Sequence, residues 1–307
     1  MSDIKLFRLN GAKAAEITGY ASDLEKPLQS LIEANLDALL GIRLIASEYS
    51  TGRTHGGRID TLGIDENNCP VIIEYKRSVG ENVMSQGLFY LDWLMDHQAE
   101  FKLLALERYG KETADAIDWS SPRVICIAGD FTRYDAHAVH RIGASVELLR
   151  YRRFGSDLLL FELVNATISE VAKPTMPAKA RIASKPAADS ESRPRWLPKL
   201  TPDLCELYES AKAYIESLGD DIQQKNLKHY VAFKRLRNFA TVVAYQRSIV
   251  LYLHVDPTNV GLESGFTRDV RNVGHWGTGD LEVVLTSHRD FEKAKPLIAM
   301  AHGTTYL

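Results

Sequence analysis

Apolar residues are spaced along the first half of the chain in two alternating patterns. Where they recur every three or four positions they predict amphipathic helices, at 24–40, 83–97 and 101–117. Where they form short runs bounded by turn residues they predict strands, at 43–49, 58–64, 70–76 and 124–128. A further helix and two strands complete this half, and such alternation is typical of an α/β layer fold. We therefore predict one α/β domain over residues 1–166.

The pattern stops at residues 167–198 and then resumes in a different form. This segment contains five prolines and almost no large apolar residue before Trp196, so it cannot form a core and is typical of a linker. Beyond it, the spacing predicts two helices around four strands: helices at 203–218 and 289–302, strands at 231–233, 239–246, 248–255 and 281–285. We predict a smaller α+β domain over 199–307, because 307 residues are enough for two cores.

Composition limits the partners that the chain can have. Apolar residues make up 45% and charged residues 25% of the sequence, as in globular proteins, and the net charge of −3 means that any basic surface must be local. Cys69, Cys126 and Cys205 stand singly, which favours reduced core thiols over disulfides or zinc. The sequence shows no secretion signal and no run long enough to span a membrane, so we expect a cytoplasmic protein without membrane contact.

Two acidic residues and a lysine stand on neighbouring predicted strands. Glu74 and Lys76 are two positions apart on one strand, so their side chains point to the same face. Asp60, on the preceding strand, could reach that face too. Mg²⁺ prefers oxygen ligands and typically takes one or two carboxylates, leaving the other positions to water and phosphate. We therefore expect Asp60 and Glu74 to bind Mg²⁺, which Mn²⁺ could replace, and Lys76 to orient the attacking water or to neutralise charge in the transition state.

Taken alone, a glutamate and a lysine two residues apart form an ordinary ion pair on a solvated hairpin. Three features favour a site instead. Asp60 lies close by in the chain, and Gly56 and Gly57 before it permit close approach of the backbone. Gln86 and Tyr90 follow at helical spacing on one face of the next predicted helix. Ser47, Glu48, Arg53 and His55 are also polar residues in this region, but their type and position decide nothing, and a lone loop histidine is more often structural.

The order of these motifs resembles a known family. G-R-I-D, then V-I-I-E-Y-K-R, then S-Q-G-L-F-Y is similar to the PD-(D/E)XK nucleases, most closely to their NucS and RecB-like branch, over residues 24–96. The resemblance implies a restriction-endonuclease-like fold in the first domain. It implies metal ligands at Asp60 and Glu74, a catalytic lysine at Lys76, and Gln86 and Tyr90 in support of the site.

The family also places a glutamate on the first helix, and two residues could fill this position. Glu25 falls inside the apolar stripe of the predicted helix, whereas Glu33 falls near its edge. Glu25 also stands three residues before Leu28 and upstream of Asn35, as the family glutamate does. We favour Glu25, in which case Glu33 would be a solvated helix residue.

The second domain contains a stretch with many basic residues and no acidic one, residues 222–255. Its basic residues are interleaved with aromatic ones, which suits phosphate contacts combined with base stacking. We expect nucleic-acid contacts from Lys228, Lys234, Arg235 and Arg237. The alternative is a solvated basic strand face with aromatic side chains in the core.

A glycine-rich loop follows, and we interpret His275 and Trp276 within it as structural. The domain resembles an uncharacterised domain that often follows nuclease-like modules and is sometimes labelled a predicted transport protein. Neither a membrane span nor a phosphate-binding loop supports transport.

The function that the sequence favours is a metal-dependent endonuclease that hydrolyses phosphodiester bonds of DNA, in repair or in defence against foreign DNA. Two other classes stay open. One is a non-catalytic nucleic-acid-binding protein with a degenerate nuclease fold, and the other is an interaction module for an acidic protein partner. The sequence also leaves open RNA as a substrate and a homodimer as the assembly.

Overall fold

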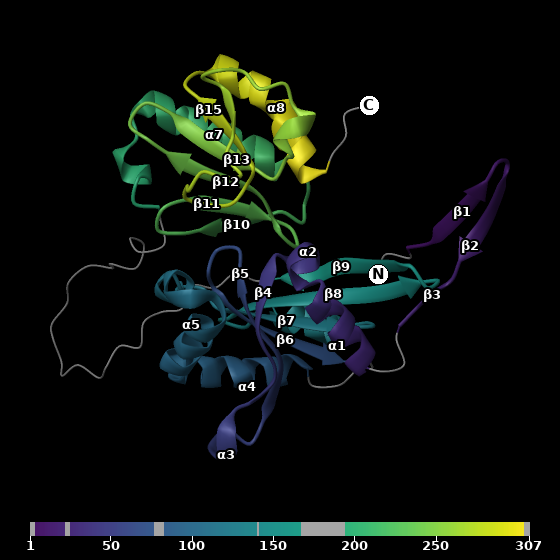
Figure 1. Cartoon of the computed structure of the whole chain (residues 1–307). Helices are drawn as coiled ribbons and strands as arrows, with labels where there is room; N and C mark the ends of the chain where they lie inside the picture. Colours follow the sequence, from purple (N-terminus) through teal and green to yellow (C-terminus); the bar gives the residue numbers. More distant parts are fainter. Residues whose placement is uncertain (1–3, 22–24, 77–82, 140, 167–193, 304–307) are drawn as a thin grey trace, which may run out of the picture. The chain divides into compact units, whose positions relative to one another are not determined.

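The computed structural model describes residues 4–21, 25–76, 83–139, 141–166 and 194–303 (Figure 1). The chain divides into two compact units, Met1–Ala172 and Lys173–Leu307. Most of the segment expected to be a linker, residues 167–193, lies outside the described residues. The end of that segment does not behave as a linker, because Trp196 and Leu197 pack against the core of the second unit. The Trp196 indole also donates a hydrogen bond to the His229 carbonyl, at 2.9 Å.

The first unit is built on a seven-stranded mixed sheet, which confirms the predicted α/β class. The strands run in the order β3-β8-β7-β6-β5-β4, with β9 added to β8. Their bounds are β3 Gly19–Tyr20, β4 Ile42–Ser50, β5 Arg58–Asp65, β6 Pro70–Lys76, β7 Arg123–Ala128, β8 Ser145–Phe154 and β9 Leu158–Ala166. β4, β5 and β6 pair antiparallel, whereas β6, β7 and β8 pair parallel. Two further strands, β1 Leu6–Asn10 and β2 Lys13–Ile17, form a separate antiparallel pair that the apolar pattern did not predict.

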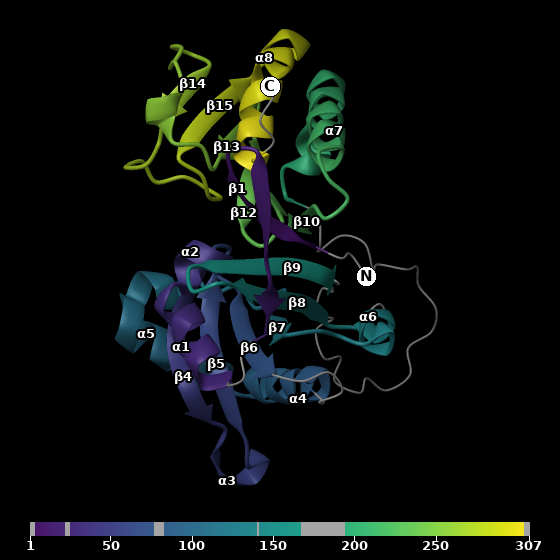
Figure 2. The ribbon, with the colours of Figure 1, turned by 90° about the vertical axis from the view of Figure 1, so that its right-hand side faces the viewer.

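Helices cover both faces of this sheet. They are α1 Glu25–Ala34, α2 Leu36–Leu40, α3 Gly52–His55, α4 Val83–Asp96, α5 Gln98–Asp115 and α6 Arg133–Val139. The helix predicted at 24–40 is divided at Asn35, and it ends at Gly41, whose φ of 62° favours glycine. α1 lies against β5 and β6, and α4 against β6 and β7 (Figure 2). Both views place α3 at the far tip of the β4–β5 hairpin.

The second unit is a six-stranded antiparallel sheet with two helices. The strand order is β10-β11-β12-β13-β15-β14. The strands are β10 Gln223–Asn226, β11 Val231–Lys234, β12 Asn238–Ala244, β13 Ile249–Leu253, β14 Thr267–Asp269 and β15 Leu281–Leu285. α7 Pro202–Glu216 and α8 His288–His302 begin at the caps Thr201 and Ser287, whose side chains accept backbone N–H bonds. Their apolar residues share one core with alternate residues of the strands.

Among the described residues, no helix is both long and apolar enough to cross a membrane.

A buried ion cluster joins three strands of the first unit. Arg123 at the start of β7 lies 3.2 Å from Asp65 on β5 and 2.7 Å from Glu147 on β8. All three side chains are less than a tenth exposed. Because a buried carboxylate that loses its partner is strongly destabilising, this cluster fixes the end of β5 against β7 and β8.

Arg123→Ala should therefore lower the free energy of unfolding of the first unit by about 3–5 kcal/mol, because it leaves two buried carboxylates without their cation. Urea denaturation followed by circular dichroism measures the loss. The matched control is Lys102→Ala, which removes a cation from an exposed pair with Asp115 and should change little. Equal small effects of the two substitutions would show that the buried cluster does not stabilise the sheet.

Candidate active site

Asp60 and Glu74 lie side by side because β5 and β6 pair antiparallel. The register sets Thr61 opposite Ile73, so Asp60 and Glu74 are the next neighbours along the two strands. The Asp60 N–H donates to Glu74 Oε1 at 3.2 Å, and the Tyr75 N–H donates to Asp60 Oδ2 at 3.1 Å. Each carboxylate is thus held in place by the backbone of the other strand.

Glu74 is buried and Asp60 is half-buried, and one oxygen atom of Glu74 lacks a partner. Glu74 has no exposed surface, and within the described part of the chain its Oε2 atom accepts no hydrogen bond. Burial, and then the nearby charge of Asp60, raise the pKa of Glu74 to about 9. Burial also raises the pKa of Asp60, against the opposing effects of the Tyr75 N–H and of Lys76. A buried carboxylate in this position is costly unless a cation or a proton joins it.

Two adjacent carboxylates, of which Glu74 has an unpartnered oxygen, fit a divalent cation that prefers oxygen ligands. They are two ligands and no more: no group of three or more His, Cys, Asp or Glu able to hold a metal ion is found among the described residues. The other positions around such an ion would belong to water and to phosphate oxygens, as is usual for Mg²⁺.

Lys76 stands at the end of β6, on the same face of the strand as Glu74. Its positive charge lowers the pKa of both Asp60 and Glu74, so its ammonium group lies on their side of the sheet. The side chain is half-buried. The structure therefore brings together the three residues that the sequence singled out.

Gln86 and Tyr90 project from α4 toward the start of β5. The Gln86 amide donates to the Tyr90 hydroxyl at 3.3 Å, and the Arg58 N–H donates to the same oxygen at 3.1 Å. A Cβ on Gly57 would lie 2.5 Å from the Tyr90 ring, which explains why this position needs glycine. Tyr90 is 5% exposed, so it holds the strand next to Asp60 rather than meeting a substrate.

The two glutamates of α1 occupy different places. Glu25, at the start of the helix, is half-buried, and its charge raises the pKa of Asp60. Glu33 accepts hydrogen bonds from Gln29, Ser47 and Thr61, at 3.0, 2.9 and 2.6 Å. The expectation that Glu33 is a solvated helix residue is therefore wrong, because the edge of the helix faces β4 and β5 rather than water.

Three residues beside the site had no assigned role from sequence. Gln29 donates to the Asp60 carbonyl at 2.8 Å and so ties α1 to β5. Glu48 on β4 forms ion pairs with Lys26 and Arg58, both at 2.6 Å, and adds negative charge near Asp60 and Glu74. The φ of Glu48 is 54°, a conformation that is uncommon for a residue with a Cβ and that concentrates at functional sites. His55 packs with its ring 5.6 Å from the Phe89 ring, a structural contact.

The second unit does not present the basic face that its sequence suggested. Lys234 is 4% exposed, and the aromatic neighbours Phe233 and Phe239 belong to the core. Arg235 is paired with Asp221 at 2.7 Å, and Arg237 is half-buried. β11 is an interior strand that is buried along its length, so its one basic residue, Lys234, is buried with the others. Of the four residues expected to contact nucleic acid, only Lys228 is both exposed and not part of an ion pair described for this unit.

A protein of Haemophilus influenzae, described as uncharacterized, is 30% identical to this chain over 304 residues, which cover 97% of this chain and 99% of that protein. The chain belongs to the family of this protein. Because the match extends over nearly the whole of both sequences, the family includes both units. Residues 197–305 also match a domain of unknown function (DUF5655), which places the second unit in a recognised but functionally undescribed class.

Two solved structures show limited similarity to the chain. One is a repair endonuclease from Pyrococcus abyssi, 22% identical with a TM-score of 0.28, covering 42% of this chain and 50% of that one. The other is an EndoMS–double-stranded DNA complex, 19% identical with a TM-score of 0.23, covering 40% and 43%. The chain thus spans half or less of either structure. Scores of this size leave the function to be inferred from the residues themselves.

In protein freed of divalent cations, Glu74→Gln should increase the free energy of unfolding, by about 1–3 kcal/mol near pH 9. The folded state holds Glu74 protonated up to about pH 9, whereas the unfolded chain ionises it near its usual 4.5. Wild-type stability from this group is therefore complete below pH 4.5 and declines as the pH rises to about 9. The gain of the variant should grow over the same range.

Thermal unfolding at pH 5, 7 and 9 measures this effect. The exposed Glu107→Gln serves as the control and should show no such dependence. A Glu74→Gln variant that is less stable than wild type at pH 9 would contradict the burial of an unpartnered carboxylate.

Proposed function

We propose that the first unit is a metal-dependent nuclease that hydrolyses phosphodiester bonds of DNA. One observation carries the proposal: the half-buried Asp60 and the buried Glu74 lie side by side, Glu74 has an unpartnered carboxylate oxygen, and Lys76 stands next to them. The resemblance of the motif order to the PD-(D/E)XK nucleases supports the same conclusion. A role in DNA repair or in defence against foreign DNA would follow from that activity.

Asp60 and Glu74 would hold Mg²⁺ or Mn²⁺, which when bound polarises the phosphoryl oxygen and neutralises developing negative charge. Lys76 would place its ammonium group against the scissile phosphate or the attacking water, where a fixed positive charge stabilises the transition state. Gln29 and Tyr90 keep β5 in position through the Asp60 carbonyl and the Arg58 N–H. Glu25, on the side of Asp60, is the first-helix residue that we assign to the site.

Two alternatives are less well supported by the structure. A degenerate, non-catalytic nuclease fold would have no need to keep a buried carboxylate next to a second one with a lysine beside them. An interaction module for an acidic protein would need a broad basic face, and Lys234 and Arg235 do not supply one. The deciding comparison is therefore between DNA binding with cleavage and DNA binding alone.

Cleavage should depend on the metal and on the carboxylate pair. Plasmid, linear, single-stranded, branched and mismatched DNA, together with single-stranded RNA, should be incubated with the full chain and Mg²⁺ or Mn²⁺. Activity on at least one substrate should disappear in EDTA, return with the metal, and be absent from Asp60→Asn. Cleavage that persists undiminished in EDTA would refute the metal-dependent mechanism, and Glu107→Gln controls for substitution of an acidic residue elsewhere.

Lys76→Ala should separate chemistry from binding. The cleavage rate under single-turnover conditions should fall by about 100-fold or more, because an electrostatic group of the transition state is lost. DNA affinity, measured by fluorescence anisotropy in EDTA, should change little, since one phosphate contact among several is removed. Lys111→Ala, at an exposed lysine of α5, is the matched control. A Lys76→Ala variant that cleaves at the wild-type rate would exclude a catalytic role for Lys76.

A further inference from the structure

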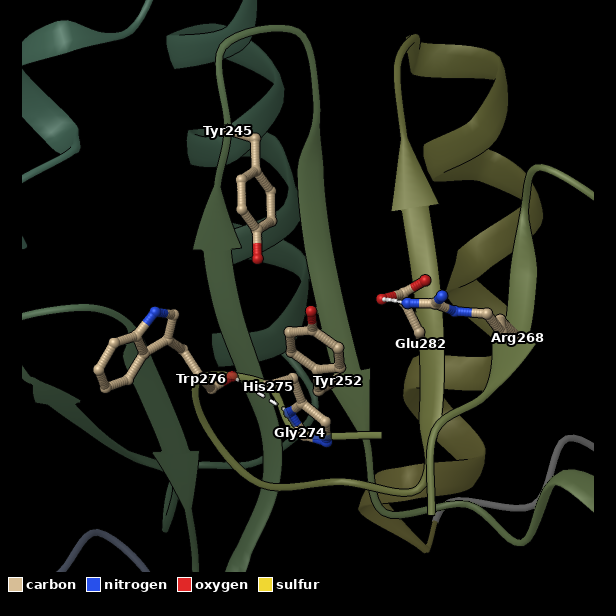
Figure 3. A pocket seen from close by; sticks show the side chains of 7 residues that line it. All are labelled: Tyr245, Tyr252, Arg268, Gly274, His275, Trp276 and Glu282. Atoms are coloured by element: carbon tan, nitrogen blue, oxygen red, sulfur yellow. Dashed lines mark hydrogen bonds and ion pairs between the residues drawn. The ribbon is translucent and has the colours of Figure 1, made fainter. Parts of the chain in front are cut away.

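The second unit carries an open pocket of about 640 Å³ whose lining is aromatic and charged. The lining residues come from three strands, the turn between β12 and β13, and the loop before β15: Tyr245, Tyr252, Arg268, Gly274, His275, Trp276 and Glu282 (Figure 3). None of these residues belongs to the core that α7 and α8 cover. The pocket is therefore not a packing defect of that core.

The floor of the pocket is a row of side chains across the sheet. Tyr252 on β13 stands between Thr241 on β12 and Glu282 on β15, and Glu282 stands opposite Arg268 on β14. Residues directly opposite each other share a face of the sheet. Because Leu251 belongs to the core beneath the helices and side chains alternate along β13, this row lies on the other face.

A tight loop forms one wall and fixes two rings. Gly277 and Gly279 have φ of 87° and 136°, and a Cβ on Gly277 would lie 2.4 Å from Thr241 Oγ1. Thr241 Oγ1 donates to the Thr278 carbonyl at 3.0 Å and lies 3.2 Å from the Thr278 N–H. Only glycine allows the loop to approach the strand so closely. His275 and Trp276 are therefore presented from a backbone that is anchored to the sheet.

The rings leave open surfaces that a planar ligand could cover. His275 stacks on Tyr252 with ring centroids 4.1 Å apart, and His229 stacks on Trp276 at 3.9 Å. Trp276 has one face against His229 and is nevertheless 53% exposed, so its other face is open. Tyr245 is 49% exposed, and its hydroxyl points toward that of Tyr252 (Figure 3). Aromatic side chains that gather in a pocket with a few polar groups are a common feature of ligand sites.

The charges around the pocket favour an anionic ligand over a cationic one. Glu282 is 9% exposed and is already neutralised by Arg268 at 2.8 Å, so a cation would gain little from it. The Arg268 side chain is 59% exposed and can still donate hydrogen bonds. On the other side, Lys228 and Arg195 are exposed. Burial lowers the pKa of His229, which stacks on Trp276, and the charges of Lys228 and Arg195 lower it further. Positive charge therefore lies beside the His229–Trp276 stack.

We propose that this pocket binds an unpaired nucleobase together with its phosphate. The base stacks on Trp276 and Tyr245, and the phosphate lies toward Lys228. Aromatic platforms flanked by cations are the general means by which unpaired nucleic acid is held, because every base offers a stackable face. A free nucleotide and a base within a single strand share this chemistry. The site is distinct from Asp60 and Glu74 and does not depend on the nuclease activity.

The test uses the full chain carrying Asp60→Asn, in EDTA, so that no cleavage can consume the probe. A fluorescein-labelled twelve-residue thymidine strand is compared by anisotropy with the same strand made abasic, and deoxyadenosine monophosphate is added as a competitor. Trp276→Ala and Tyr245→Ala should each weaken binding of the base-bearing strand by about ten-fold. Trp276→Phe should keep part of the affinity. Leu262→Ala, an equally exposed apolar side chain of the same unit, should change nothing.

The outcomes separate the two sources of the base. If the mononucleotide competes with the strand, and the Trp276→Ala variant no longer binds the mononucleotide, the ligand is a free nucleotide. If the strand binds but the mononucleotide does not compete, the ligand is a base within a strand. Equal affinity for the base-bearing and abasic strands would overturn the proposal, as would unchanged binding by Trp276→Ala with wild-type thermal unfolding. If Trp276→Ala does not fold, Trp276→Phe and Tyr245→Ala decide in its place. Cleavage by the wild-type chain is measured in a separate assay, so the nuclease proposal is tested independently of this one.

Discussion

The register of β5 against β6 is the constraint on which the carboxylate pair of the first unit, and the function proposed for it, depend. A slip of one residue would turn either Asp60 or Glu74 to the opposite face of the sheet. The turn between the strands sets this register: Asp65 Oδ1 accepts the N–H groups of Asn67 and Cys69, both at 2.9 Å. Asp65 is itself held by Arg123. The buried ion cluster at one end of the sheet therefore fixes the alignment of the carboxylates at the other end.

That alignment works against the stability of the metal-free fold. Glu74 loses its hydration on burial and is repelled by the neighbouring Asp60 carboxylate, which is why the pKa of Glu74 rises to about 9. Each carboxylate accepts one bond from a neutral backbone N–H, and Gln29 reaches the Asp60 carbonyl rather than its carboxylate. These bonds fix position without neutralising charge. A carboxylate pair of this kind would keep an affinity for a cation, because Glu74 Oε2 is not already satisfied by the fold.

Sequence alone could predict the parts of the site that depend on local spacing. Asp60, Glu74 and Lys76 followed from strand periodicity, since a strand places alternate residues on one face wherever it lies in the fold. The role of Glu33 could not be predicted, because it depends on which face of α1 meets β4 and β5. The role of Glu48 could not be predicted for a similar reason, because its left-handed backbone conformation is imposed by tertiary structure. The β1–β2 pair was missed because its residues are mostly exposed and show no apolar alternation.

The second unit shows why charge counted along a sequence is a poor guide to a binding surface. The acid-free stretch 222–255 suggested a basic face, yet Lys225 and Lys234 are each 4% exposed. Periodicity gives the two faces of a strand but not whether both are covered, and here the glycine loop at 274–279 covers part of the second face. The same loop presents Trp276, which the sequence pattern assigned to structure. If this unit meets nucleic acid, affinity must come from a few placed groups and from stacking, because no broad positive field is left to supply it.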